Sequence, residues 1–278
     1  MPGLDPVARL PEHLLANARL LPDREAILPL LPKRKVIAEV GVALGYFSDH
    51  FIRVCEPEHF IAVDSFDLHN VPALWGRPTK ELFSGGTHGE FFRNRFADLI
   101  AQGKMQVLED DSVAALATLA DASLDIVYLD ADHSYDAVRR ELAMVRRKIK
   151  DDGLIMLNDY IMSDAGLSNA VYGVIHATNE FMITENWEMI YFAFHSQMYC
   201  DVVLRKASTP PAPMFDGRPA DPHGLALLRR NAELEARNAA LERELEIVRA
   251  STSWRITGPL RAIRQALTPR QARSMRQE

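Results

Sequence analysis

Side chains that could bind a metal ion occur at two places in this chain, and a histidine accompanies the first of them. Asp130 precedes His133 by three residues in the stretch Asp130-Ala-Asp-His-Ser-Tyr135, and Asn158-Asp159 follows a later apolar run. Two carboxylates and an amide oxygen are hard ligands that suit Mg²⁺. A metal bound there would lower the pKa of a substrate hydroxyl. His133 would then take the proton, because a base must lie within hydrogen-bond reach.

The same residues also have a structural explanation. Aspartate is a favoured N-cap, so Asp130 and Asp159 could each begin a helix that follows a strand. His133 could be a structural histidine that is hydrogen-bonded to a carboxylate. Two facing acids on neighbouring strands favour the functional interpretation.

A second group of polar residues surrounds a turn that contains two glycines. A β-branched run ends with Glu39, Gly41 and Gly45 follow, and a helix-like run begins near Ser48. A strand, a glycine turn and a helix form the part of a doubly wound sheet that receives a nucleotide-like cofactor. The spacing G-x-x-x-G is not the G-x-G-x-x-G of dinucleotide-binding proteins. The Glu39 carboxylate would repel a pyrophosphate but could accept hydrogen bonds from a cationic or hydroxylated cofactor.

Two further acidic positions follow later apolar runs. Asp64 stands 23 residues beyond Gly41, where an acid can bind both hydroxyls of a ribose. The stretch Asp110-Asp-Ser112 is placed to meet an adenine or its ribose. The alternative for Glu39 and Asp64 is that they are ordinary surface acids.

Short apolar runs alternate with helical patterns, which predicts the elements that position these side chains. The fold class is α/β: a doubly wound, Rossmann-like, mostly parallel sheet. A helix is expected over Tyr135–Lys148, where apolar residues recur at helical spacing. Glu188–His195 and Met198–Arg205 predict a hairpin that forms an antiparallel C-terminal edge. Residues 1–35 are expected to form a helical cap. The expected parallel strands are Val36–Val40, Phe60–Asp64, Met105–Leu108, Asp125–Asp130 and Leu154–Asn158.

The chain changes character after residue 207. Prolines dominate a linker over residues 208–222, and apolar residues then recur every seven positions over residues 223–250. That period predicts a short coiled coil and a homodimer, although a single amphipathic helix is the alternative. Residues 251–278 form a basic amphipathic tail, which could contact an anionic membrane surface or a biosynthetic complex, or could be a solvated tail.

Bulk composition narrows the class of protein. The 278 residues carry a net charge of -6, which gives no argument for nucleic-acid binding. The only cysteines, Cys55 and Cys200, lack metal-like spacing and favour a reducing compartment. No signal peptide or membrane span is evident. We therefore expect a cytoplasmic protein, peripheral at the inner face of the cell membrane if the basic tail binds there.

These motifs, taken in order, resemble the class I S-adenosylmethionine-dependent methyltransferases over about residues 30–205. The resemblance implies a methyltransferase domain over residues 36–207 and S-adenosyl-L-methionine as cofactor. It implies that the methionine part is surrounded by Glu39, Gly41, Gly45 and Ser48. It also places Asp64 at the ribose, and Asp111 and Ser112 beside the adenine.

The second half of the motif set resembles the divalent-metal site of catechol-type O-methyltransferases. It is more similar to the sugar O-methyltransferases of macrolide tailoring, in which an acid precedes a histidine base by three residues. The resemblance implies Asp130 and His133 as catalytic residues, and Asp130, Asn158 and Asp159 as ligands of Mg²⁺ or another divalent cation. Those relatives have two consecutive acids where this chain has Asn158-Asp159, so one charge is missing.

The expected function is therefore O-methylation of a hydroxyl on a sugar or glycan. The stretch Ser251–Arg261 resembles the ends of bacterial glycosyltransferases of polysaccharide biosynthesis, which suggests a cell-surface polysaccharide or glycolipid as acceptor. Tailoring of a secondary metabolite is an alternative that uses the same site. A catalytically degenerate scaffold, assembled through the coiled coil, is an alternative from another class. The irregular segment Ser65–Glu90 is expected to be a lid over the acceptor.

Overall fold

The computed structural model describes residues 7–164, 170–195 and 199–208. These residues belong to the first of two compact units, Met1–Ala212. The linker from residue 209, the coiled coil over 223–250 and the basic tail over 251–278 lie outside the described residues. Those three expectations therefore stay predictions.

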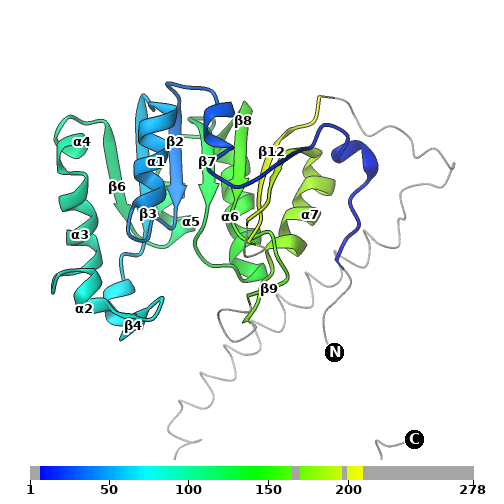
Figure 1. Ribbon diagram of the computed structural model, residues 1–278. Helices are drawn as coiled ribbons and strands as arrows, with labels where there is room; N and C mark the ends of the chain where they lie inside the picture. Colours follow the sequence, from blue (N-terminus) through cyan, green and yellow to red (C-terminus); the bar gives the residue numbers. More distant parts are fainter. Residues whose placement is uncertain (1–6, 165–169, 196–198, 209–278) are drawn as a thin grey trace, which may run out of the picture. The chain divides into compact units, whose positions relative to one another are not determined.

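An eight-stranded sheet forms the centre of this unit, in the order β1-β11-β12-β8-β7-β2-β3-β6 (Figure 1). Five neighbouring strands, from β8 to β6, run parallel to one another. The pair β11 and β12 forms an antiparallel hairpin, and β12 is antiparallel to β8. The strands are β1 (Arg19–Leu21), β2 (Val36–Val40), β3 (His59–Asp64), β6 (Met105–Glu109), β7 (Leu124–Leu129), β8 (Ile149–Leu157), β11 (Trp187–Ala193) and β12 (Asp201–Lys206).

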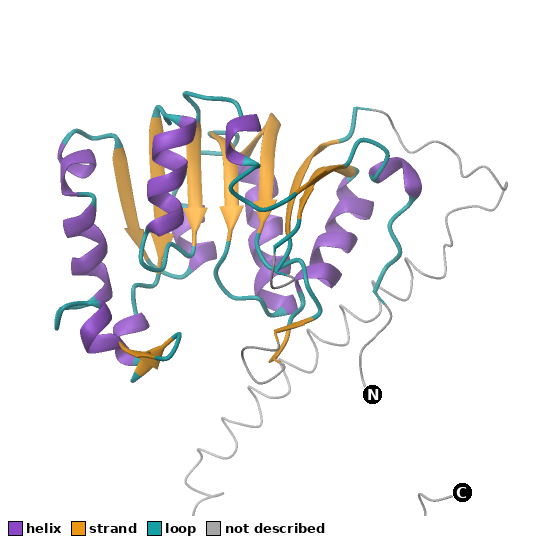
Figure 2. Ribbon diagram, viewed as in Figure 1, coloured by secondary structure: helices purple, strands orange, loops and turns teal. Residues whose placement is uncertain are grey.

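Helices cover both faces of the sheet, as a doubly wound fold requires (Figure 2). Leu116, Val138 and Phe181 pack on one face, so α5, α6 and α7 lie there. Phe51 and Phe92 pack on the other face and bring α1 and α3 to it. The helices are α1 (Tyr46–Cys55), α2 (Thr79–Leu82), α3 (His88–Arg95), α4 (Ala97–Ala101), α5 (Ser112–Ala117), α6 (Tyr135–Lys148) and α7 (Val174–Glu185).

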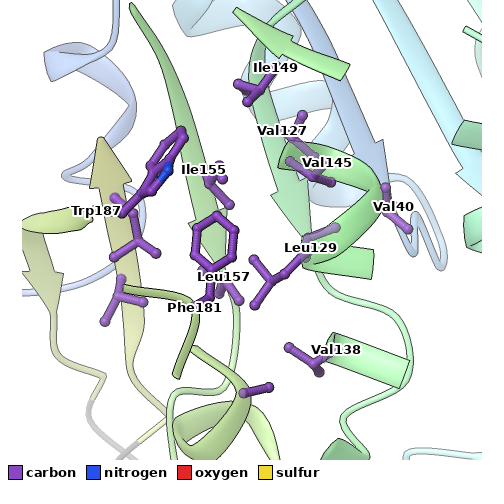
Figure 3. Packing of buried hydrophobic residues seen from close by; sticks show 14 of the residues in the cluster. Val40, Val127, Leu129, Val138, Val145, Ile149, Ile155, Leu157, Phe181 and Trp187 are labelled. Atoms are coloured by element: carbon purple, nitrogen blue, oxygen red, sulfur yellow. The ribbon is translucent and has the colours of Figure 1, made fainter. Parts of the chain in front are cut away.

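The central strand β7 is buried along its whole length, with β2 on one side and β8 on the other. Val127 and Leu129 point toward α6, where Val138 and Val145 meet them (Figure 3). Their burial contributes roughly 1.5–3 kcal/mol per side chain to the free energy of unfolding. This packing fixes where β7 ends, and therefore where Asp130 begins the next loop.

The N-terminal segment differs from the expected helical cap. Its described residues form two 3₁₀ turns, Glu12–Leu14 and Leu28–Leu30, and the strand β1. Prolines recur through this stretch and remove N–H donors that an α-helix would need. β1 pairs in parallel with β11, so it takes the edge position that we expected the hairpin to hold.

The carboxyl ends of the parallel strands point to the lower edge of the sheet in Figure 1. Two small hairpins lie near that edge: β4 (Ala73–Leu74) with β5 (Arg77–Pro78), and β9 (Ser163–Asp164) with β10 (Ala170–Val171). The first hairpin belongs to the expected lid, together with a 3₁₀ turn at Leu68–Asn70 and α2. Within the described residues, no helix has the length and apolar character needed to cross a membrane.

Candidate active site

A cavity of about 1210 Å³ opens at the carboxyl ends of β2, β3, β7 and β8. Most of the residues that the sequence singled out line it. Two do not, because Gly45 and Ser48 lie behind the cavity wall. The expected residues at the wall are Glu39, Gly41, Asp64, Asp111, Ser112, Asp130, His133, Asn158 and Asp159.

Gly41 allows the glycine turn to touch the end of β7. Its φ is 87°, and a Cβ at this position would lie 2.0 Å from the carbonyl oxygen of Asp130. Only glycine fits both the dihedral angle and the contact. Gly45 has a φ of 72° and precedes α1 as its N-cap residue, where an added Cβ would meet the rings of Phe92 and Phe96. The two glycines therefore shape the turn, and Gly41 alone reaches the cavity.

Glu39 is a buried acid at the end of β2, with 1% of its surface exposed. Burial raises its pKa to about 8, and the hydroxyl of Ser48, which donates a hydrogen bond to it, opposes that rise. Ser48 thus orients Glu39 from behind. A buried carboxylate at the cavity wall is suited to a cationic ligand, which would replace the lost hydration.

Asp64 holds the glycine turn in place with its carboxylate. Oδ2 accepts hydrogen bonds from the backbone N–H groups of Val42 (2.9 Å) and Ala43 (3.3 Å). Oδ1 accepts one from the N–H of Phe66 over 2.8 Å. The surface-acid explanation is therefore wrong for Asp64, because the side chain organises the loop as well as lining the cavity.

The third strand end supplies Asp111 and Ser112 at the start of α5. Asp111 is the N-cap, since its Oδ1 accepts from the N–H groups of Val113 and Ala114. Glu141 of α6 lies behind this end and was missed by sequence reasoning. Burial raises its pKa to about 7, and its Oε1 has no hydrogen-bond partner among the described residues. The helical period of α6 identified Glu141 only as a polar residue.

His133 lies between two carboxylates at the other end of the cavity. Its Nε2 is 3.7 Å from Asp130 Oδ1 and 3.6 Å from Asp159 Oδ2. The ring of Tyr172 stacks on the imidazole, with centroids 4.7 Å apart and an interplanar angle of 13°. Burial lowers the pKa of His133, which favours the neutral imidazole. Nε2 is buried and has no hydrogen-bond partner within the described part of the chain.

The two acids do not cap helices. The N-cap of α6 is Ser134, whose side chain accepts from Ala137 N–H, and Asp159 has a φ of 52° in a loop after β8. Burial raises the pKa of Asp159 to about 7, and Asp201 and Asp164 add to that rise. Burial also raises the pKa of Asp130, against the effect of the Arg24 guanidinium.

A hydrogen-bonded chain runs beneath these acids. The guanidinium of Arg24 donates to the hydroxyl of Tyr128 (3.1 Å), which donates to Asp201 Oδ2 (2.8 Å). The side-chain amide of Asn158 donates to Asp201 Oδ1 (3.3 Å). Arg24 and Asp201 were missed, because neither stands in a local pattern that marks a site.

A third carboxylate, that of Asp164, lines the cavity together with Asp130 and Asp159. Asp164 of β9 accepts hydrogen bonds from Tyr172 (3.1 Å) and Tyr199 (2.7 Å) through their hydroxyls. All three residues line the cavity. Asp164 and Tyr172 come from the short segments of β9 and β10, which hydrophobic periodicity does not reveal, whereas Tyr199 lies within the predicted run Met198–Arg205.

The residues present do not fit a divalent ion well. Asp130 Oδ2 lies 3.6 Å from the Arg24 guanidinium, so a permanent positive charge already faces that carboxylate. Asn158 donates its amide nitrogen to Asp201, so the uncharged Oδ1 is the only side-chain atom that it could offer an ion. Within the described ranges, no group of three histidine, cysteine, aspartate or glutamate side chains is arranged to hold a metal. Metal binding therefore gains no support from this geometry.

The sequence comparisons identify the domain. Residues 38–160 match the family model of a methyltransferase domain. That segment begins in β2 and ends just after Asp159, so it contains the glycine turn, His133 and both acids. Comparison with curated proteins finds no match.

Solved structures with a similar fold include other methyltransferases. A putative type 11 methyltransferase from Sulfolobus solfataricus is 16% identical, covers 69% of this chain and 96% of its own, and has a TM-score of 0.45. A SAM-dependent methyltransferase from Aquifex aeolicus is 12% identical over 66% and 89% of the two chains, with a TM-score of 0.45. On the family match, residues 38–160 form a methyltransferase domain, and the protein is a methyltransferase.

Proposed function

We propose that this methyltransferase uses S-adenosylmethionine to methylate a hydroxyl group of a sugar or glycan. The single observation that carries the proposal is the position of His133. Its Nε2 is buried, lacks a partner among the described residues, and lies between Asp130 and Asp159. The cavity at which it lies also contains the glycine turn. A neutral imidazole placed this way is suited to take a proton from an acceptor hydroxyl.

The cofactor is assigned to the end of the cavity near the glycine turn. Glu39 is suited to the ammonium group of the methionine part, because the ligand's charge would stabilise the buried carboxylate. Asp64 and the start of α5 are suited to the ribose and adenine. This arrangement agrees with the order in which the sequence resemblance placed those residues.

When bound, the cofactor would supply a methyl group on a positively charged sulfur, and the acceptor oxygen would displace that sulfur, which would keep the electron pair of the broken carbon–sulfur bond. The hydroxyl proton goes to His133 Nε2, and Asp130 and Asp159 stabilise the imidazolium that forms. Positioning of the two reactants is worth roughly 7–11 kcal/mol of the barrier in well-oriented systems.

The acceptor end favours a neutral, polyhydroxylated molecule. Asp130, Asp159 and Asp164 line it as hydrogen-bond acceptors, and Tyr172 and Tyr199 add aromatic surface. Such a wall repels phosphate and carboxylate groups and can accept hydrogen bonds from several hydroxyls. A glycan fits this chemistry. The glycan context also rests on the resemblance of Ser251–Arg261, which lies outside the described residues.

Two other functions remain as competing hypotheses. A secondary metabolite with neighbouring hydroxyls would use the same base and the same acids. A degenerate scaffold would bind cofactor without turnover, and Asn158 is the feature that suggested it. The intact cavity and the partnerless His133 favour catalysis over the scaffold.

Acceptor profiling tests the proposal. Purified full-length protein is incubated with methyl-labelled S-adenosylmethionine and either neutral methyl glycosides or catechols. Label transfer to a glycoside that is lost in His133→Gln supports the proposal. Transfer only to catechols favours the tailoring alternative. Calorimetric binding of the cofactor without transfer to any acceptor favours the scaffold.

A further inference from the structure

Arg24 enters the active site from outside the segment that matches the methyltransferase family. Its guanidinium lies 3.6 Å from Asp130 Oδ2 and donates to the hydroxyl of Tyr128 over 3.1 Å. It also lies over the ring of Phe47, 4.4 Å from the centroid. One side chain thus contacts Asp130 just after β7, Tyr128 within β7, and Phe47 of α1.

The fold holds Arg24 in this position. The preceding strand β1 pairs with β11 in the sheet. The following turn is fixed by Asp23, whose Oδ1 accepts from the N–H of Ala26 over 2.8 Å. Ile27 and Leu28 are then completely buried. The segment that carries Arg24 is therefore held on both sides, by β1 before it and by the buried Ile27 and Leu28 after it.

Acidic side chains surround the Arg24 guanidinium, and their positions indicate its role. Asp130 faces the guanidinium directly, and Asp201 is linked to it through Tyr128. An arginine side chain stays charged at any physiological pH. Its contact with Asp130 Oδ2 leaves Oδ1 directed at His133. Asn158, the neighbour of Asp159, is uncharged and donates its amide to Asp201 Oδ1.

We propose that Arg24 is a positioning residue that supplies the fixed positive charge beside Asp130, in place of a bound divalent cation. The proposal rests on the proposed function, since it assigns how the His133–Asp130 pair is held. The charge of Arg24 favours the ionised form of Asp130 against the effect of burial and orients this side chain, and Asp130 then stabilises the imidazolium that forms on His133. Methyl transfer by this protein consequently needs no metal.

The first test needs no acceptor. Full-length protein is titrated with Mn²⁺ and free Mn²⁺ is followed by electron paramagnetic resonance. We expect no Mn²⁺ site that depends on Asp130. A one-to-one site that disappears in Asp130→Asn would overturn the proposal, whatever the acceptor proves to be.

The second test uses the acceptor that profiling identifies. Chelator-treated wild type should keep full turnover. Arg24→Gln should lower kcat by about 10²-fold, as a misplaced catalytic group does, a larger effect than on cofactor affinity, which Arg24 influences only through its charge near Glu39. Arg24→Lys should retain part of the activity, and added guanidinium should restore part of it to Arg24→Ala. Arg53→Gln, at an exposed arginine paired with Asp49, is the matched control.

The outcomes separate the two proposals. Full kcat in Arg24→Gln, or loss of wild-type turnover on chelation with recovery on adding Mg²⁺, overturns the role of Arg24. Absence of turnover on every acceptor contradicts the proposed function, and the Mn²⁺ titration still decides the inference. If the Arg24→Ala variant unfolds at a lower temperature than the wild type, the Arg24→Lys variant and the wild-type chelation measurement decide the role of Arg24.

Discussion

The backbone N–H of Gly173 donates a hydrogen bond to the carbonyl oxygen of His133 over 2.7 Å. A Cβ on Gly173 would lie 2.1 Å from the backbone nitrogen of Tyr135. The N-terminus of α7 is therefore in direct backbone contact with the loop that carries His133, the proposed base. Because both contacts are to backbone, a side chain at residue 173 cannot be accommodated by a change of rotamer.

Gly173→Ala should lower turnover by displacing His133. The new methyl must push the 133–135 loop outward, and we expect kcat to fall by about 10²-fold, the cost of a misplaced group. Steady-state kinetics measure kcat, and calorimetry measures cofactor binding, which should persist. Gly86→Ala is the control, because its added Cβ would lie 3.1 Å from Glu90 Oε2, a much looser contact than the one at Gly173. Unchanged kcat in Gly173→Ala would show that the loop does not position the base.

Asp159→Asn should abolish most turnover while leaving cofactor binding intact. The substitution removes the carboxylate 3.6 Å from His133 Nε2 and keeps the side-chain size. Asp152→Asn changes an exposed aspartate elsewhere on β8 and should have no effect on either measurement. Equal loss of cofactor affinity in Asp159→Asn would place this acid at the cofactor rather than at the acceptor.

Cofactor binding should release a proton from Glu39. Its pKa of about 8 in the free protein means that the carboxyl group holds its proton at pH 7. A cation bound beside it lowers that pKa, so close to one proton leaves on binding. Cofactor affinity should therefore rise with pH up to about 8 and then level off.

Calorimetry in buffers of different ionisation enthalpy measures this proton release. Glu39→Gln should eliminate it and weaken cofactor binding. Glu58→Gln, at an exposed glutamate before β3, should change neither. Release that persists in Glu39→Gln would assign the proton to another group.

Tyr199→Phe should weaken binding of the acceptor alone. The hydroxyl donates to Asp164 Oδ1 over 2.7 Å, and its loss frees that carboxylate from one restraint. A single hydrogen bond is worth about 0.5–1.5 kcal/mol, so KM for the acceptor should rise roughly 2- to 13-fold. Tyr191→Phe, on β11 beside Arg19, is the control. A changed cofactor affinity instead would contradict the acceptor assignment.

The sequence predicted the elements whose patterns are local. Val36–Val40 and Tyr135–Lys148 agree with β2 and α6 to the residue, because a short run rich in β-branched residues and a helical stripe of apolar residues each mark a single element. β8 begins five residues earlier than expected, at Ile149, since charged residues interrupt its apolar run. α7 was not predicted, because buried Thr178 and Asn179 break its apolar pattern.

The site was predictable where a side chain stands at the end of a strand or just after it. Glu39 is the last residue but one of β2, and Asp130 and Asp159 follow β7 and β8, so topology alone brings them to one edge. Arg24 and Asp201 reach the same place through pairing between distant segments. No local pattern records such pairing, and only the folded sheet shows it.

The pairing of β1 with β11 joins residues 19–21 to residues 191–193. Arg24 is therefore synthesised early, but the strand before it can pair only after the C-terminal hairpin has been synthesised. Because β11 is joined to β8 through β12, the segment that holds Arg24 becomes part of the sheet only when the chain is present to residue 206. Completion of the site thus depends on completion of the domain.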